Sequence, residues 1–399
     1  MNRIPSIVVA LGVISMLTDM SSEMIYPLLP AFLTQVLGAS PAALGLIEGV
    51  AESTSSLVKV ISGSIADRMD RRKPLVVLGY TIAGVVRPLV AFAHSWPAVL
   101  VIRFCDRVGK GIRSAPRDAL LADSTPEDVR GTAYGLHRAL DHIGAVVGPL
   151  AAAVLTGVFH LGFRDVFLIA AIPSVISIVV LVSMVKEPAR EGAGRTVTGS
   201  LTFKTLAADW RLIPDKLKIF LVALFVFSIG NSTDAFILLR LHQSGVPVSS
   251  AALFWAGLHA VKVFATWQGG KLADRYNPRS LMLCGWLWYA LIYTGFGWVD
   301  DPVLMIVIFA LYGFHFGFTE PAERALVASL SPAHLRGTAF GLFHFIIGMA
   351  ALPASLMFGW IFQTFSSQAA FTTGAVIALL ASLVVWRGFK DGLTHPAVP

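Results

Sequence analysis

Apolar residues gather into long runs that alternate with short polar connections along the whole chain. A helix that crosses a bilayer needs about 20 mainly apolar residues, and a chain of this length with short connections has room for about twelve such helices. The pattern predicts them at residues 5–36, 42–66, 74–93, 97–121, 131–157, 164–185, 216–242, 249–270, 279–298, 302–326, 337–363 and 368–388.

The composition agrees with this pattern. Hydrophobic residues make up 55% of the 399 residues and charged residues only 14%, and the mean hydropathy is +0.72. Soluble proteins carry about 25% charged residues, so the apolar excess here must face lipid rather than water. The two cysteines, Cys105 and Cys284, lie far apart inside apolar runs and do not indicate a disulfide framework. We therefore expect an all-α membrane protein.

Lysine and arginine concentrate in alternate connections between the predicted helices. The positive-inside rule assigns such connections to the cytoplasm, together with both termini and the longest polar segment. The net charge of +7 is then a signature of topology and does not indicate a nucleic-acid partner. We predict a multi-pass protein of the cell inner membrane with an N-terminal six-helix half (1–186), a cytoplasmic linker (187–215) and a C-terminal six-helix half (216–399).

An internal repeat relates the two halves. The segment Gly63-SIADRMDRR-Lys73 returns as Gly270-KLADRYNPR-Ser280, displaced by 207 residues. A second pair, Pro126-EDVRGTAYG-Leu136 and Pro332-AHLRGTAFG-Leu342, is displaced by 206 residues. Two matches at nearly the same offset predict two similar halves related by an axis along the membrane normal, with the substrate site between them.

These residues resemble the major facilitator superfamily, whose cytoplasmic loop motif is Gly-x-x-x-Asp-Arg-x-Gly-Arg-Arg/Lys. The first copy matches at Gly63, Asp67, Arg68, Arg71 and Arg72, with Asp70 in place of a glycine, and the more eroded second copy matches at Gly270, Asp274, Arg275 and Arg279. The resemblance implies the major facilitator fold of twelve helices in two pseudo-symmetric halves. It also implies a cytoplasmic charge latch, made in one conformation and broken in the other. Asp67 is suited to a neighbouring helix terminus or an arginine, whereas the arginines have a second interpretation as topology anchors only.

The fifth predicted helix carries a second family signature, at Gly135, Gly144, Gly148 and Pro149. In the family this signature is associated with proton-driven exporters, so the resemblance to the twelve-span drug/proton antiporter branch implies outward transport. Small residues permit close helix packing, and a proline weakens a helical hydrogen bond and favours bending. Packing alone is the alternative interpretation.

Charged side chains inside the predicted helices are candidates for a transport pathway, because they are costly in lipid. Carboxylates whose hydration changes can bind and release protons, and the proton-coupling candidates are Asp19, Glu23, Glu48 and Glu52. The candidates for a substrate or charge network are Arg103, Asp106, Arg107, Lys110, Asp234 and His259. Acids and deep bases balance within the first four predicted helices, so several bases, including Lys59 and Arg87, are expected to be structural counter-ions.

Together these features favour a proton-coupled secondary transporter that exports a small organic or drug-like molecule by alternating access as a monomer. The alternative is uptake or exchange of a small organic anion bound by the arginines of the fourth helix, such as Arg103 and Arg107. The sequence contains no phosphate-binding loop, nucleophilic-serine elbow or paired zinc ligands on a helix. We therefore expect no enzyme activity, no cofactor and no metal; the expected partners are the substrate, protons and the lipid bilayer.

Overall fold

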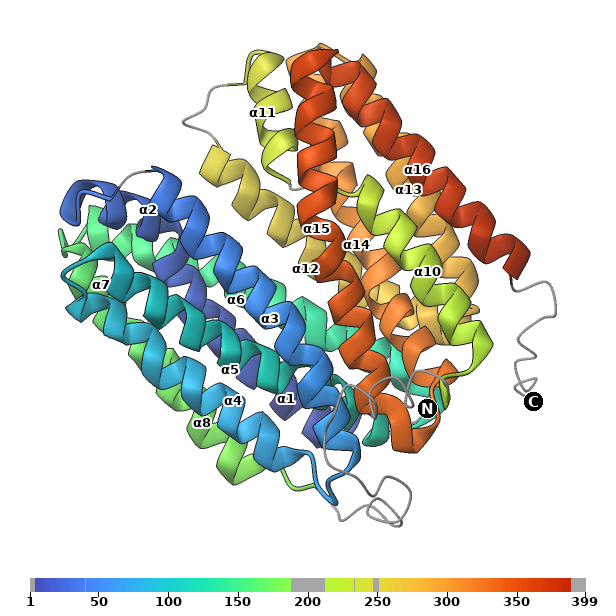
Figure 1. Cartoon of the computed structure of the whole chain (residues 1–399), viewed down its shortest axis with the longest axis horizontal. Helices are drawn as coiled ribbons and strands as arrows, with labels where there is room; N and C mark the ends of the chain where they lie inside the picture. The colour runs from blue at the N-terminus through green and yellow to red at the C-terminus, as the bar shows by residue number, and fades with distance from the viewer. Residues whose placement is uncertain (1–3, 40, 188–211, 233, 247–250, 389–399) are drawn as a thin grey trace. The chain divides into compact units, whose positions relative to one another are not determined.

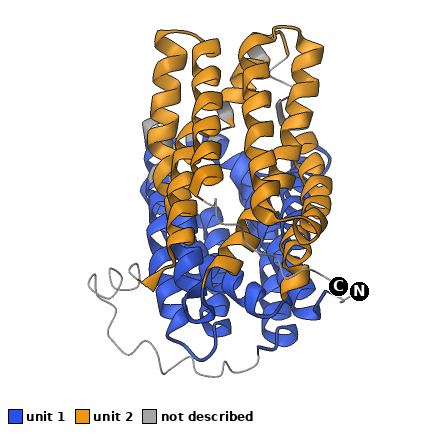
Figure 2. Cartoon of the chain, turned by 90° about the vertical axis from the view of Figure 1, so that its right-hand side faces the viewer, with its two compact units in different colours: residues 1–126, 136–211, 332–345 blue, residues 127–135, 212–331, 346–399 orange. Residues whose placement is uncertain are grey.

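The computed structural model describes residues 4–39, 41–187, 212–232, 234–246 and 251–388, and all regular secondary structure in these residues is helical. The chain divides into two compact units (Figure 2). Unit 1 comprises residues 1–126, 136–211 and 332–345, and unit 2 comprises residues 127–135, 212–331 and 346–399. Most of the predicted linker, 187–215, lies outside the described residues.

Unit 1 is built mainly from helices of the N-terminal part of the chain (Figure 1). They are α1 (Ser6–Ile25), α3 (Pro41–Asp67), α4 (Lys73–Val86), α5 (Trp96–Asp123), α7 (Phe163–Ile169) and α8 (Ala171–Met184), with α6 (Arg130–Gly157) from Leu136 onward. Helix α5 packs against α3 and α4, and α1 packs against α8. Three short turns of helix, η1 (Tyr26–Leu28), α2 (Leu29–Ala31) and η2 (Phe32–Val36), continue the first predicted span beyond α1.

Unit 2 has a corresponding set of helices. They are α10 (Asp215–Gly230), α11 (Ala235–Gln243), α12 (Ala251–Arg275), α13 (Pro278–Trp298), α14 (Pro302–Leu330) and α16 (Ser367–Gly388), with α15 (Arg336–Thr364) from Ile346 onward. Helix α14 packs against α12 and α13, and α16 packs against α10 and α13.

Two helices begin in one unit and end in the other. The first turns of α6 belong to unit 2, where the short η4 (Glu127–Val129) packs against α12, and the first turns of α15 belong to unit 1, where η6 (Ala333–Leu335) packs against α3. These two segments are the two copies of the second repeat motif. Each copy therefore packs beside the helix that ends in the first motif of the opposite half of the sequence.

The helices fit the predicted membrane spans. Eight segments among the described residues are long and apolar enough to cross a membrane. The other predicted spans coincide with α3, α5 and α12, which carry several charged side chains, and with the pair α10 and α11, where the helix is interrupted after Gly230. The prediction of an all-α membrane fold is confirmed.

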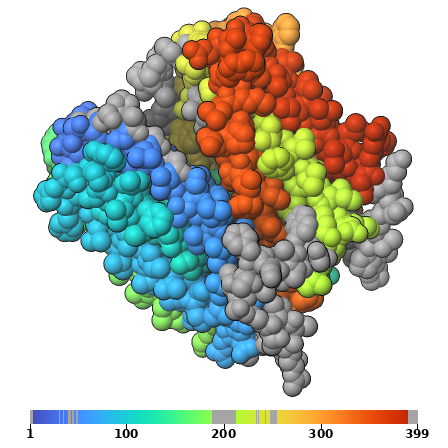
Figure 3. All heavy atoms as spheres, in the orientation of Figure 1, coloured from blue at the N-terminus to red at the C-terminus, as the bar shows by residue number. Residues whose placement is uncertain are grey.

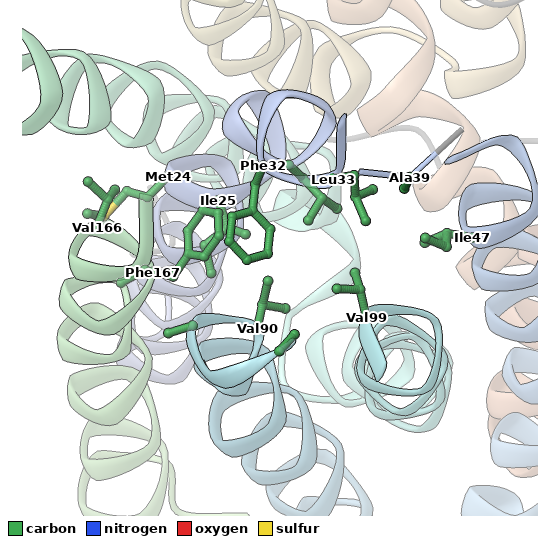
Figure 4. Close-up of a cluster of buried hydrophobic side chains, with 14 of the residues drawn as sticks. Met24, Ile25, Phe32, Leu33, Ala39, Ile47, Val90, Val99, Val166 and Phe167 are labelled. Carbon is green, nitrogen blue, oxygen red and sulfur yellow. The ribbon is translucent and has the colours of Figure 1, made fainter. Parts of the chain in front are cut away.

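A cluster of buried apolar side chains holds the end of α1 against its neighbours within unit 1 (Figure 4). Phe32 lies at its centre, and its ring makes edge contacts with Phe167, at a centroid distance of 5.2 Å, and with Phe163, at 6.3 Å. Pro27 and Pro30 lack a backbone N–H, which accounts for the change from regular α-helix to short turns just before this cluster. The cluster therefore anchors the end of α1 within unit 1.

Large apolar side chains are also exposed on the outer faces of the helices. Leu78 and Val85 on α4, which lies on the face drawn in Figure 3, and Ile172, Val175 and Val179 on α8 are all more than 40% exposed. Exposure of branched aliphatic residues along whole helices is unfavourable in water and favourable in lipid. These helix faces are therefore suited to contact acyl chains.

Candidate functional site

The first copy of the loop motif caps a helix. Asp67, the last residue of α3, accepts hydrogen bonds from the backbone N–H groups of Gly337 (2.8 Å) and Thr338 (2.6 Å) in the first turn of α15. It also accepts one from Arg72 Nη2 at 2.8 Å, and both side chains are almost fully buried. The first N–H groups of a helix have no intrahelical acceptor, and a carboxylate satisfies them and opposes the positive end of the helix dipole. The predicted placement of Asp67 at a helix terminus and against an arginine is found within unit 1.

Further charges support this contact. Arg72 also bonds to Asp123 at the end of α5, and Asp123 Oδ1 accepts from Arg336 Nη1 at 2.5 Å. Asp67, Arg72, Asp123 and Arg336 thus form a continuous network, which we call the Asp67 latch. Of the other motif arginines, Arg68 donates to the carbonyl of Ser64 at 2.7 Å, and Arg71 is exposed.

The second copy makes the equivalent contact within unit 2. Asp274, near the end of α12, accepts hydrogen bonds from the N–H groups of Gly131 (2.5 Å) and Thr132 (2.6 Å) in the first turn of α6. Among the described residues, no cation lies within 4.0 Å of its carboxylate, and the following Arg275 is exposed. We call this contact the Asp274 latch. The two latches connect opposite halves of the sequence. The aspartate of the loop motif in each half caps the helix that begins with the second repeat motif of the other half.

Glycines allow the backbones to approach at both latches. A Cβ on Gly63 would overlap the carbonyl of Gly337, and a Cβ on Gly270 would overlap that of Gly131. Gly135 lies against the backbone of Gly270 in the same way. These glycines are therefore required for close helix contact, as the sequence predicted for small residues in membrane helices.

The remaining glycines of the fifth-span signature face α1 within unit 1. A Cβ on Gly144 would lie 3.0 Å from the nitrogen of Met20, and one on Gly148 would lie 2.6 Å from the carbonyl oxygen of Met20. Helix α6 continues through Pro149 to Gly157. In this structure the glycines thus bring α6 against the stretch of α1 that carries Asp19 and Glu23.

A buried ion pair occupies the middle of unit 1. Asp106 on α5 accepts from Arg87 Nη2 (2.9 Å) and Nε (3.1 Å), and Arg103 Nη1 lies 3.7 Å from its other oxygen. Arg87 also donates to the carbonyl of Thr18 on α1 at 3.0 Å. Arg87 is therefore the counter-ion of Asp106, in agreement with the role expected from the sequence. Arg103 belongs to the same network of charges.

Three of the proton-coupling candidates share a positive neighbour instead. Lys110 on α5 is among the charges that act most strongly on Asp19, Glu23 and Glu52. Within the described part of the chain, none of these three carboxylates has a cation within 4.0 Å. Asp19 and Glu23 are half-buried, whereas Glu52 is exposed.

Other members of this group lie close by. Arg107 acts on Glu23 and Glu52, and Lys59 acts on Glu52. The fourth proton-coupling candidate, Glu48, lies outside the residues whose side chains the structure describes. Helices α1, α3 and α5 of unit 1 thus bring carboxylates and bases together without closing all of them into ion pairs.

One pair in unit 1 was missed at the sequence level. Asp118 on α5 accepts from both Nε and Nη2 of Arg117, and its second oxygen lies 2.7 Å from Nε2 of His344 on α15. Arg117 also donates to Ser15 Oγ on α1 at 3.1 Å. Asp118 and His344 are 226 positions apart in the sequence, and no local pattern indicates that they pair.

Unit 2 contains fewer charges and more aromatic rings. Asp234 accepts a hydrogen bond from the hydroxyl of Tyr312 at 2.9 Å, and its other oxygen lies 3.9 Å from Lys262 Nζ. His259, one turn before Lys262 on α12, is half-buried and makes an edge contact with Trp255 at 5.2 Å. Asp234 and Lys262 therefore belong to one site. Among the described residues no group of three or more potential ligands forms a metal site.

Comparison with known proteins gives a consistent result. The family model described as Major Facilitator Superfamily matches residues 11–267 and 245–397. The chain is 31% identical over 381 residues to an uncharacterized MFS-type transporter of Methanocaldococcus jannaschii, covering 94% of this chain and 93% of that protein. It is 23% identical over 385 residues to the multidrug resistance protein MdtG of Escherichia coli, covering 94% and 92%.

Solved structures show the same fold. The human organic anion transporter MFSD10 superposes with a TM-score of 0.79 at 16% identity, and the Escherichia coli fucose:proton symporter FucP with a TM-score of 0.75 at 13% identity. Each comparison covers 95% of this chain and 98% of the other. The chain therefore belongs to the Major Facilitator Superfamily and is a multi-pass membrane transporter of small molecules, not an enzyme.

Proposed function

We propose that the protein is a proton-coupled secondary transporter that exports a small organic or drug-like molecule by alternating access. The observation that carries this proposal is that Asp19, Glu23 and Glu52 have no cation within 4.0 Å among the described residues, although Lys110 acts on all three. The bases around these three carboxylates, which include Arg107 and Lys59 as well as Lys110, are shared rather than paired one to one, so a proton can serve as an additional counter-charge. Asp106, by contrast, is already paired with Arg87 and is assigned a structural role.

Proton binding would then change the balance of the group. When one carboxylate is neutralised, Lys110 is left to the remaining two, and the preferred arrangement of α1, α3 and α5 changes. The two latches are the contacts that we propose to be made in one conformation and broken in the other, since each joins a carboxylate to the first backbone N–H groups of a helix from the opposite half of the sequence. A transporter needs such contacts to be strong enough to hold one state and weak enough to release it.

Outward transport is supported by two likenesses. The relative MdtG is described as a multidrug resistance protein, and the spacing of Gly135, Gly144, Gly148 and Pro149 resembles the signature of proton-driven exporters. The alternation of basic connections supports a cell inner membrane location with both termini and the 187–215 linker in the cytoplasm. We assign residues 1–186 and 216–399 as the two moving halves, acting as a monomer.

Transport in proteoliposomes with an imposed pH gradient tests the proposal. A pH-sensitive dye inside the vesicles would report proton movement when a lipophilic cation, a neutral drug or an organic anion is added. Asp19→Asn and Glu52→Gln should each abolish substrate-dependent proton movement and leave the protein folded. Asp215→Asn, at a side chain that is 91% exposed, is the matched control and should behave as the unmodified protein. Normal proton-driven transport by both Asp19→Asn and Glu52→Gln would refute the assignment.

A second candidate function is exchange or uptake of a small organic anion. Arg103, Arg107 and Lys110 on α5 lie within one group of charges, and arginine is well suited to carboxylate ligands. MFSD10, which shares the fold, is described as an organic anion transporter. Competition for binding by organic anions that disappears in Arg107→Ala would favour this function over cation or drug export.

A further inference from the structure

Lys262 on α12 is a buried ammonium group held against aromatic faces. Its Nζ atom lies 3.6 Å from the ring centroid of Phe316 on α14 and 5.6 Å from that of Trp255 on its own helix. Asp234 supplies a carboxylate oxygen at 3.9 Å, beyond hydrogen-bond distance. The lysine side chain is only 5% exposed. Two ring faces and one carboxylate around a cation are the features of an ammonium-binding cage.

The parts of this cage differ in their accessibility. Asp234 is 22% exposed, and Trp255 and Phe316 are half-buried, while the ammonium group itself is enclosed. The carboxylate is held in place from the other side, because its Oδ1 accepts the hydroxyl of Tyr312 at 2.9 Å while Oδ2 faces the lysine. An incoming molecule therefore meets the rings and the carboxylate in a fixed arrangement.

From this geometry we infer that the cage of Trp255, Phe316 and Asp234 binds lipophilic organic cations, and that Lys262 is a tethered occupant that such a cation displaces. The inference rests on the proposed transport of small organic molecules and names their class. Exchange of one cation for another leaves Asp234 with a counter-charge throughout, so neither step exposes an unpaired carboxylate in a desolvated site. Ring faces accept hydrogen bonds only weakly and cannot replace the water around a strongly hydrated cation, so they select cations with an apolar shell.

Lys262 competes with any added cation for the cage because it belongs to the same chain. Lys262 is linked to α12 and is always present near the cage, so an added cation must outcompete it. Removal of the ammonium group with retention of an unbranched apolar side chain should therefore strengthen cation binding. A lysine that served as an anion ligand would give the opposite result.

The test is binding of tetraphenylphosphonium to the purified full-length protein in detergent, by equilibrium dialysis at fixed pH. Lys262→Met should bind the probe about tenfold more tightly, and Phe316→Leu about tenfold more weakly, since a desolvated cation on a ring face is a major term. Lys262→Arg retains a competing cation and should bind as the unmodified protein does. Lys271→Met is the matched control, because Lys271 also lies over a ring, that of Trp267 at 4.6 Å, but is exposed.

Two outcomes would overturn the inference: equal or weaker probe binding by Lys262→Met, or unchanged binding by Phe316→Leu in protein that elutes as a single folded species. Loss of benzoate binding in Lys262→Met would instead assign the lysine to an anion site. The assay uses no pH gradient, so its result is independent of proton coupling. Tighter binding by Lys262→Met together with normal proton-driven transport by Asp19→Asn and Glu52→Gln would retain the cage and reject the coupling assignment.

Discussion

The two latches differ in their electrostatic support, and this difference can be measured. Asp67→Asn removes the charge that pairs with the fully buried Arg72 and that caps Gly337 and Thr338. Breaking a buried ion pair by removal of one partner costs about 3 kcal/mol at the lower end of the usual range, and the lower end applies here because Arg72 keeps Asp123 as a second partner. Asp274→Asn weakens two hydrogen bonds to backbone N–H groups but breaks no ion pair among the described residues. A cost of about 1 kcal/mol is expected there.

Amide hydrogen exchange reads these contacts directly, because the capped N–H groups are the exchanging sites. Since each 1.4 kcal/mol is a factor of ten, Asp67→Asn should raise exchange in residues 336–345 by about a hundredfold, and Asp274→Asn should raise exchange in residues 130–135 by less than about tenfold. The measurement is mass spectrometry of the purified protein in detergent, with each variant serving as the control for the other latch. An equal or larger effect of Asp274→Asn at its own segment would refute the reasoning that the arginine makes the Asp67 latch the stronger of the two.

Three further predictions concern the interior of unit 1. Arg87→Met should lower the free energy of unfolding in detergent by about 3 kcal/mol, because the buried Asp106 loses both hydrogen bonds from Arg87 and is left with the more distant Arg103 at 3.7 Å. The double variant with Asp106→Leu should recover most of the loss, and failure to recover would contradict the counter-ion role of Arg87. Gly144→Leu should prevent folding, because its Cβ would overlap the backbone of α1, whereas Gly157→Leu meets open space and should elute from gel filtration as the unmodified protein does. His344→Gln should reduce thermal stability by about 1 kcal/mol through the weakened contact with the carboxylate on α5, and an unchanged unfolding curve would show that this contact contributes nothing.

The sequence predicted the fold because the signals involved are local or repetitive. A run of about 20 apolar residues is visible without knowledge of its neighbours, and the 207-residue offset between Gly63 and Gly270 relates the two halves directly. The repeat does not show which copy of the aspartate motif contacts which copy of the glycine-threonine motif. An aspartate in one half has two equivalent glycine-threonine turns available, and only the structure shows that Asp67 takes the turn beginning at Gly337.

The balance of charges predicted that some buried bases are counter-ions, but it did not predict which residue each charged side chain contacts. Equal numbers of acids and deep bases in the first four spans indicated that some bases are counter-ions, and Arg87 is one. The balance could not indicate which acids stay unpaired, since that depends on the rotation of each helix about its axis. The same reason explains why the pair of Asp118 and His344 was missed. A polar residue in a membrane helix is evident from sequence, whereas its partner on another helix is a property of packing.

The uneven distribution of charge between the units then has a mechanistic meaning. In unit 1, Asp19, Glu23 and Glu52 share the influence of Lys110 with no ion pair among the described residues, so under the proposed function the addition of one proton would alter the charge balance of the whole group. In unit 2, the described neighbours of Lys262 include two rings and the carboxylate of Asp234, so the site would change if another cation replaced the lysine ammonium group. The proposed coupling of protons to an organic cation would use both kinds of site. Separation of the two sites along the chain lets each be altered by mutation without direct loss of the other, which is the property that the variants of Asp19 and Lys262 exploit.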